Sequence, residues 1–274
     1  MRAVERTIVA AMPEADAPNP GNPIHSSDGA RDYGFRAALV GGATIYGWCA
    51  AAIVDAAGMA WLDHGWADVA FRRPVFPDDR LTIAIRADGV FEVRGDDARV
   101  RIDGHLGLGD APWLSEFVVP QHKPPQPAAD PLPRLTPQNV PVGQDLRTRL
   151  VSLSREEAEV FCREKQNESL PCFYGDSAHI HPAWYANQPI YWLHHSFSYG
   201  PAIHTASRVQ HRRGAQVGQT LVVAGHCVDA FERKGHQYIV NDVEIRDAAG
   251  VSIAAIRHTA IYQVARTLRF QESV

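Results

Sequence analysis

The sequence predicts an α+β protein built from two similar halves, each with one long buried helix followed by an antiparallel meander of strands. A proline-rich segment divides the chain near its middle, and the pattern of apolar segments repeats at a fixed offset. Residues 120–141 contain eight prolines, a density that disfavours helix and sheet and favours extended polyproline II. We therefore expect an N-terminal unit over residues 1–119, a linker over 120–145 and a C-terminal unit over 146–274.

A shift of 140 residues aligns the two halves without a gap. The alignment places Gly41 over His181 and continues to Leu81 over Leu221. Identities are few, but apolar and turn segments recur in the same order. A repeat of this length indicates two copies of one structural unit.

Each half opens with a long apolar segment, over residues 43–62 and 182–197. The first is apolar on nearly all sides, as a helix enclosed by other structure must be. Several of the runs that follow alternate apolar and polar residues, which predicts strands with one covered face. These runs cover 67–76, 80–89 and 98–106, then 204–213, 219–231, 236–247 and 251–264. This layout is typical of a double hotdog, in which two antiparallel sheets each wrap round a long central helix and pair at their edges.

The composition is that of a soluble globular protein, with 45% hydrophobic and 21% charged residues. A net charge of -4 argues against nucleic acid or an anionic membrane as the main partner. No secretory signal and no membrane span is expected, which favours a cytoplasmic location. The four cysteines have no CxxC spacing, so neither disulfides nor a zinc site is expected. The other histidines do not show ligand spacing, and no nucleotide-binding glycine motif is present, so we expect no metal and no cofactor.

Residues 22–44, NPIHSSDGARDYGFRAALVGGAT, resemble the hydratase motif of the MaoC-like, (R)-specific enoyl-CoA hydratase family. That motif is roughly D-x-N-P-[IL]-H-x-D-P-x-x-A-x-x-x-G-F-x-x-P-I-x-H-G. One residue is missing between the histidine and the Gly-Phe pair, and the resemblance covers about two dozen residues. The matching positions are Asn22, Pro23, Ile24, His25, Ala30, Gly34, Phe35 and Gly42.

The resemblance implies a hydratase or dehydratase that acts on an enoyl or 3-hydroxyacyl thioester of coenzyme A or an acyl carrier. It makes His25 the candidate base and the Gly41-Gly42 region the candidate oxyanion site, with Tyr33 in the same loop as a substrate-binding candidate. The motif's aspartate falls at Pro20 and its second histidine at Gly41. Asp28 is either the substitute orienting carboxylate or a turn residue beside a glycine.

The second half offers a rival site, because Asp176 precedes His181 with the spacing of the motif's aspartate and histidine. The ungapped repeat instead places His181 at the helix opening. Under either alignment His181 lies at a helix N-terminus, where its pKa is lowered and a thioester carbonyl is stabilised. We therefore count His181 as a catalytic candidate, with Asp176 and Tyr185 as candidates for substrate binding.

A second class of function is a hotdog protein that has lost hydration chemistry, since a fold does not fix a function. Such a protein binds an acyl thioester or a small hydrophobic ligand, or acts as a thioesterase, cyclase or isomerase. The missing aspartate at position 20 favours this alternative. Because one chain already holds two hotdog units, either a monomer or a homodimer is expected.

Overall fold

In the computed structural model, which describes residues 1–19 and 21–265, the strands of both halves form one ten-stranded antiparallel sheet. The strand order is β1-β3-β4-β5-β2-β7-β10-β9-β8-β6, so the second half mirrors the first. The strands of the first half are β1 (Val4–Val9), β2 (Gly65–Phe71), β3 (Arg80–Ile85), β4 (Val90–Gly95) and β5 (Val100–Leu108). Those of the second are β6 (Arg149–Ser152), β7 (Ile203–His211), β8 (Thr220–Arg233), β9 (His236–Asp247) and β10 (Ser252–Gln263).

The two halves meet where β2 pairs antiparallel with β7. Asp68 lies opposite Arg208 in this ladder, and its carboxylate accepts a hydrogen bond of 3.0 Å from the arginine Nε. These two residues are separated by the 140-residue offset of the repeat, so the pseudo-twofold axis passes through their pair. The predicted double hotdog is confirmed, with its two half-sheets joined edge to edge.

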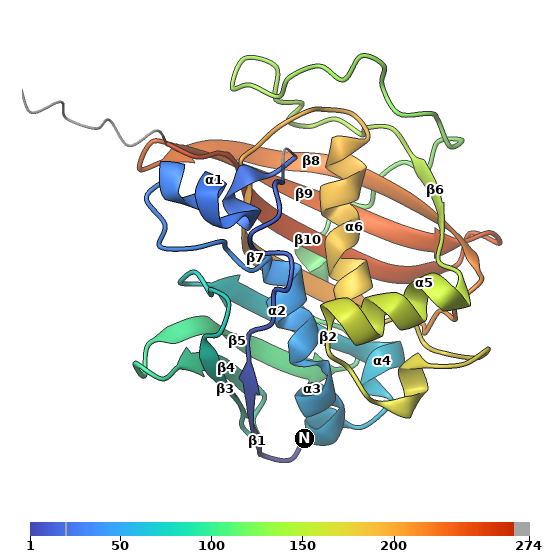
Figure 1. Cartoon of the computed structure of the whole chain (residues 1–274). Coiled ribbons are helices and arrows are strands. Elements are labelled where there is room, and N and C mark those ends of the chain that lie inside the picture. Colours follow the sequence, from blue (N-terminus) through green and yellow to red (C-terminus); the bar gives the residue numbers. More distant parts are fainter. Residues whose placement is uncertain (20, 266–274) are drawn as a thin grey trace, which may run out of the picture.

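Two central helices lie side by side on one face of the sheet (Figure 1). The first half supplies α2 (Gly42–Trp48) and α3 (Ala50–Ala57), which are separated at Cys49 and so form two helices where one was expected. The second half supplies α6 (Pro182–His194), which continues through Pro189. A Cβ atom on Gly47 would lie only 2.6 Å from the Cβ atom of Ala183, so the glycine permits the close approach of α2 and α6.

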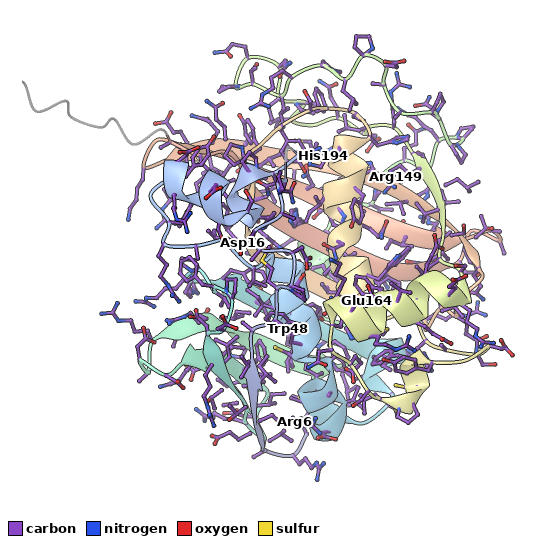
Figure 2. The ribbon with its side chains drawn as sticks, viewed as in Figure 1. Arg6, Asp16, Trp48, Arg149, Glu164 and His194 are labelled. Atoms are coloured by element: carbon purple, nitrogen blue, oxygen red, sulfur yellow. The ribbon has the colours of Figure 1, made fainter. Side chains whose placement is uncertain are left out.

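The remaining helices are short. They are α1 (Ser27–Asp32), α4 (Trp61–His64) and α5 (Arg155–Val160). Trp48, labelled in Figure 2, donates its indole N–H to the carbonyl oxygen of Lys165 at 3.2 Å and so ties α2 to the segment after α5. Within the described residues, no helix has both the length and the apolar character needed to cross a membrane.

The stretch from Glu116 to His122, which leads into the proline-rich segment, packs along the opposite face of the sheet from the helices. The backbone N–H of Val118 donates to Asp242 on β9 at 2.7 Å, and Nε2 of His122 lies 3.0 Å from a carboxylate oxygen of Glu244 on the same strand. Arg257 on β10 donates to the backbone carbonyl of Glu116 as well. Residues 116–122 therefore cover part of the outer face of the second half-sheet. The proline-rich segment beyond them contacts the loop after α6, where the N–H of Leu135 donates to the carbonyl oxygen of Ser198 at 2.9 Å.

Each half has its own hydrophobic core between helices and sheet. The first core includes Ile53 on α3 and Phe91 on β4, both fully buried. In the second, Trp192 of α6 rests on Gly225 of β8, where an added Cβ atom would lie 2.6 Å from the indole ring. A third, small cluster of Ile24, Ala30 and Leu39 lies under the loop that carries the motif.

Candidate functional site

The motif loop is anchored on the second half of the chain. The Asn22 side chain donates to the carbonyl oxygen of Ala202 at 2.9 Å and accepts from its N–H at 3.0 Å. His25 then ends a short 3-10 turn, and Ser26 caps α1 by accepting a hydrogen bond from Gly29. A Cβ atom on Gly29 would lie 2.3 Å from the carbonyl oxygen of Pro23, so only glycine lets α1 fold back onto this turn. These contacts hold His25 in one place.

The imidazole of His25 is fixed as one tautomer. Its Nδ1 atom lies 2.7 Å from the carbonyl oxygen of Leu39. Because a carbonyl only accepts, Nδ1 carries the proton and Nε2 keeps its lone pair. Burial lowers the pKa of His25 below its ordinary value, although the hydrogen bond to Leu39 partly opposes this shift. The side chain is therefore neutral at pH 7 and can accept a proton at Nε2.

His25 lies against the opening of α2. A Cβ atom on Gly41, the N-cap residue, would be 3.8 Å from the ring carbon Cε1 of His25. Among the described side chains none caps α2, and the first amides of a helix have no partner within it. The N–H groups at Gly42 and the residue after it are therefore donors beside the His25 ring. This brings together the predicted base and the predicted oxyanion site.

The opening of α6 is closed by the histidine at the equivalent position. His181 Nδ1 accepts a hydrogen bond from the N–H of Ala183 at 3.2 Å, so the ring caps its own helix. Its Nε2 atom lies 3.8 Å from a carboxylate oxygen of Glu168, and both side chains are buried. Burial lowers the pKa of His181. This placement matches the ungapped repeat, which puts His181 over Gly41, and Glu168 is a partner that the sequence did not reveal.

Two predicted carboxylates point away from the histidines. The Asp28 side chain is 98% exposed and accepts a hydrogen bond from Arg31 one turn later in α1. The backbone carbonyl of Leu39, and not Asp28, therefore orients the His25 ring. The prediction of Asp28 as the orienting carboxylate is wrong, and Asp28 is a surface residue. Asp176 is 87% exposed and pairs with Arg155 at 2.7 Å. It does not form a dyad with His181, whose acidic neighbour is Glu168.

The two predicted tyrosines lie in different cores. Tyr33 packs against the small cluster under the motif loop. Tyr185 is buried in the second core, where its ring meets the edge of His211 at a centroid distance of 5.5 Å. Burial raises the pKa of Tyr185, so its hydroxyl stays protonated. Substrate contact by either tyrosine stays a prediction.

The second half also contributes to the α2 opening, through a residue that the sequence did not single out. On β7, His204 is so close to Gly42 that an added Cβ atom on the glycine would lie 3.0 Å from its Nδ1. Nε2 of His204 donates to the carbonyl oxygen of Ala206 at 3.1 Å, which leaves the lone pair on Nδ1. The ring of His258 on β10 follows at a centroid distance of 4.2 Å. Burial lowers the pKa of both His204 and His258.

In the described part of the chain, no group of three or more histidine, cysteine, aspartate or glutamate side chains is arranged to hold a metal ion. The described cysteines are all free thiols, and Cys49 is fully buried with its pKa raised by that burial. The residues that meet at the α2 opening are thus neutral imidazoles and backbone amides.

No protein-family model matches the sequence, and no curated protein matches it. Solved structures do match, over nearly the whole chain. A conserved hypothetical protein from Mycobacterium tuberculosis, RV0216, described as having a double hotdog fold, matches with a TM-score of 0.68 and 12% identity over 95% of this chain and 96% of its own. A putative MaoC domain protein dehydratase from Chloroflexus aurantiacus matches with a TM-score of 0.58 and 14% identity, covering 96% of each chain.

A third structure, GphF Dehydratase 1, matches with a TM-score of 0.57 and 16% identity over 96% of this chain and 94% of its own. At these identities the likeness shows the fold. This chain is a double hotdog protein, and its structural neighbours include MaoC-like dehydratases.

Proposed function

We propose that this chain is a hydratase or dehydratase that interconverts an enoyl thioester and a 3-hydroxyacyl thioester. The proposal rests on one observation, the position of neutral His25 against the uncapped opening of α2. Adding water to a conjugated thioester requires a base that is neutral near pH 7 and donors for the enolate oxygen. The dehydratases among the structural neighbours support the proposal at the level of the fold.

In the hydration direction, Nε2 of His25 takes a proton from water while the water oxygen bonds to the β-carbon of the substrate. The electrons of the double bond move to the thioester oxygen, where the amide of Gly42 and its neighbour stabilise the negative charge. The imidazolium then gives its proton to the α-carbon. His25 serves first as the base and then as the acid. It takes one proton and returns one, so no second side chain is needed for proton transfer.

This scheme differs from the two-residue motif that the loop resembles. The motif's aspartate is replaced by Pro20, a position that lies outside the described residues, and Asp28 is directed to solvent. The carrier of the thioester is proposed to be coenzyme A or an acyl carrier protein, on the resemblance of the loop. A monomer or a homodimer is compatible with the two hotdog units in each chain.

The test is to mix the purified protein with short and medium trans-2-enoyl-CoA esters and to follow the loss of the conjugated thioester absorbance. His25→Ala should lower kcat/KM by about 10²- to 10⁴-fold, the usual contribution of a general base. Its melting temperature should stay close to that of the wild type. His105→Ala, which removes an exposed histidine from β5, is the matched control and should leave turnover unchanged. Equal turnover by His25→Ala and the wild type would exclude His25 as the base.

A second candidate is a double hotdog protein without hydration chemistry, such as an acyl-thioester binder, thioesterase, cyclase or isomerase. One observation favours it: among the described residues, no carboxylate hydrogen-bonds His25. The products separate the two candidates. A hydratase forms a 3-hydroxyacyl thioester and releases no thiol, whereas a thioesterase releases free coenzyme A, which a thiol reagent detects.

A further inference from the structure

Three polar side chains form a row across the helix-covered face of the second half-sheet, on neighbouring strands. His258 on β10 lies opposite Ser207 on β7 and opposite Asn241 on β9. We call Ser207, Asn241 and His258 the polar row. Each is two residues from a member of the second core, Val209, Val243 and Ile256 respectively, and therefore points to the same face as that core.

The polar row is buried and has no hydrogen-bond partners. Ser207 is 1% exposed, Asn241 is 0% exposed and His258 is 3% exposed. Every nitrogen and oxygen atom of these three side chains lacks a partner within the described part of the protein. Native proteins pair nearly all such groups, so a set of neighbouring unpaired groups needs an explanation. One explanation is a bound molecule that supplies the missing hydrogen-bond partners.

The polar row is continuous with the candidate active site. The His258 ring lies 4.2 Å, between centroids, from the ring of His204. His204 in turn lies against Gly42 at the opening of α2, and His25 lies against Gly41 at the same opening. A series of contacts therefore leads from His25 through the α2 opening and His204 to the polar row.

The side chains of the polar row are uncharged at pH 7. Burial lowers the pKa of His258 to about 4, so its imidazole is uncharged at pH 7 and offers one donor and one acceptor. The serine hydroxyl and the asparagine amide also offer both. The charged groups of these strands lie elsewhere: Arg257 donates to Asp242 at 2.7 Å, and these residues alternate with the row along β10 and β9. The row therefore fits an uncharged oxygen function and offers no countercharge to a carboxylate, phosphate or ammonium group.

We propose that the acyl group of the substrate carries an uncharged oxygen, as a hydroxyl, ether or keto group, beyond its reacting carbons, and that Ser207, Asn241 and His258 bind it. This deepens the proposed function and rests on it. The acyl end is the part that reaches the row, because the row is buried whereas a nucleotide or a carrier protein must remain in solvent. The chain thus prefers oxygenated acyl thioesters to plain fatty acyl thioesters.

The test compares trans-2-octenoyl-CoA with analogues in which an ether oxygen replaces one tail methylene, moved along the chain in successive compounds. One position of the oxygen should raise kcat/KM by about tenfold or more over the plain chain. Ser207→Ala and Asn241→Leu should each abolish most of this preference. Ser196→Ala removes another buried, unpartnered hydroxyl, located after α6, and should retain the preference. If Asn241→Leu fails to fold, Ser207→Ala is sufficient to test the inference.

Binding of the corresponding saturated S-alkyl-CoA thioethers, measured by calorimetry, separates this inference from the proposed function. Selective binding of the oxygenated thioether, lost in Ser207→Ala, would support the polar row even if no ester were hydrated. Equal turnover and equal binding of plain and oxygenated chains would overturn the inference about the polar row without contradicting the proposed hydratase activity. A crystal structure in which water molecules occupy the row while an oxygenated thioether is bound would overturn it as well.

Discussion

The carbonyl oxygen of Leu39 lies 2.7 Å from Nδ1 of His25, and this hydrogen bond decides which nitrogen of the imidazole can act as a base. The bond comes from the backbone of the irregular segment that leads into α2 and not from a side-chain carboxylate. A carbonyl orients the ring but adds no negative charge beside it. An imidazolium formed in the proposed reaction would therefore have no ion pair with a described side chain.

The pH dependence of turnover follows from this environment. The base is active when neutral, and burial lowers the pKa of His25 from its ordinary value of 6.5. The acidic limb of the kcat/KM profile should therefore have its midpoint below pH 6.5, so more than half of the maximal activity should be present at pH 6.5. Steady-state kinetics between pH 4.5 and pH 8 measure this. A midpoint at or above 6.5 would contradict the assignment of His25.

The two glycines at the opening of α2 should respond differently to alanine. A Cβ atom on Gly42 would lie 3.0 Å from His204, which forces that ring to move, whereas a Cβ atom on Gly41 would have ordinary contacts of 3.7 and 3.8 Å. Gly42→Ala should lower the free energy of unfolding by about 1–3 kcal/mol and reduce turnover. Gly41→Ala is the matched control and should change stability little. Urea denaturation and the enoyl-CoA assay test the pair, and equal effects would argue against close packing of His204 on Gly42.

His181 is expected to act in stability rather than in chemistry. Its Nδ1 caps α6 and its Nε2 faces the buried carboxylate of Glu168. His181→Ala should lower the free energy of unfolding by about 1–3 kcal/mol, because it removes a cap and leaves a buried carboxylate without its neighbour. His181→Asn, which can still cap, should recover part of this loss. If both variants kept full stability but lost turnover, His181 would belong to the active site after all.

Buried neutral histidines should make the fold sensitive to acid. Burial lowers the pKa of His211 to about 3 and that of His258 to about 4, from 6.5. Between pH 6.5 and about 4 the unfolded chain binds protons at these rings and the folded chain does not, so stability falls as the pH falls. Each ring contributes about 1.4 kcal/mol per pH unit in this window.

Chemical denaturation at pH 7 and pH 5 measures this dependence. His258→Gln should make it shallower by the contribution of one ring. The exposed His105→Gln is the control and should leave it unchanged. An equal pH dependence in the wild type and His258→Gln would show that His258 does not remain neutral in the fold.

The sequence predicts the architecture well, because a repeat at a fixed offset constrains the whole chain. All seven predicted runs overlap strands, and the opening of each central helix falls at the expected residue. Three strands were missed. The edge strands β1 and β6 have no buried position, so they give little apolar signal in the sequence. β4 does alternate, with Phe91 and Val93 buried, but it is only six residues long and carries Glu92 and Arg94.

The sequence predicts only those residues of the candidate site that are close to one another along the chain. His25, Gly41 and Gly42 lie within one short motif, and the structure brings them together. The polar row is not local, because it depends on the register of β7, β9 and β10. The outward direction of Asp28 depends on how α1 folds back on its preceding turn, a packing that Gly29 permits but that the motif does not by itself predict.

The seam between β2 and β7 joins two units that have the same strand order yet different helix openings, one free at Gly41 and one capped by His181. In a dimer of identical subunits every substitution appears twice, so both openings must stay alike. Fusion into one polypeptide removes that constraint. The two units can therefore differ at their helix openings: the first carries the loop with His25, and the second supplies Ala202, which anchors that loop, and His204 beside Gly42.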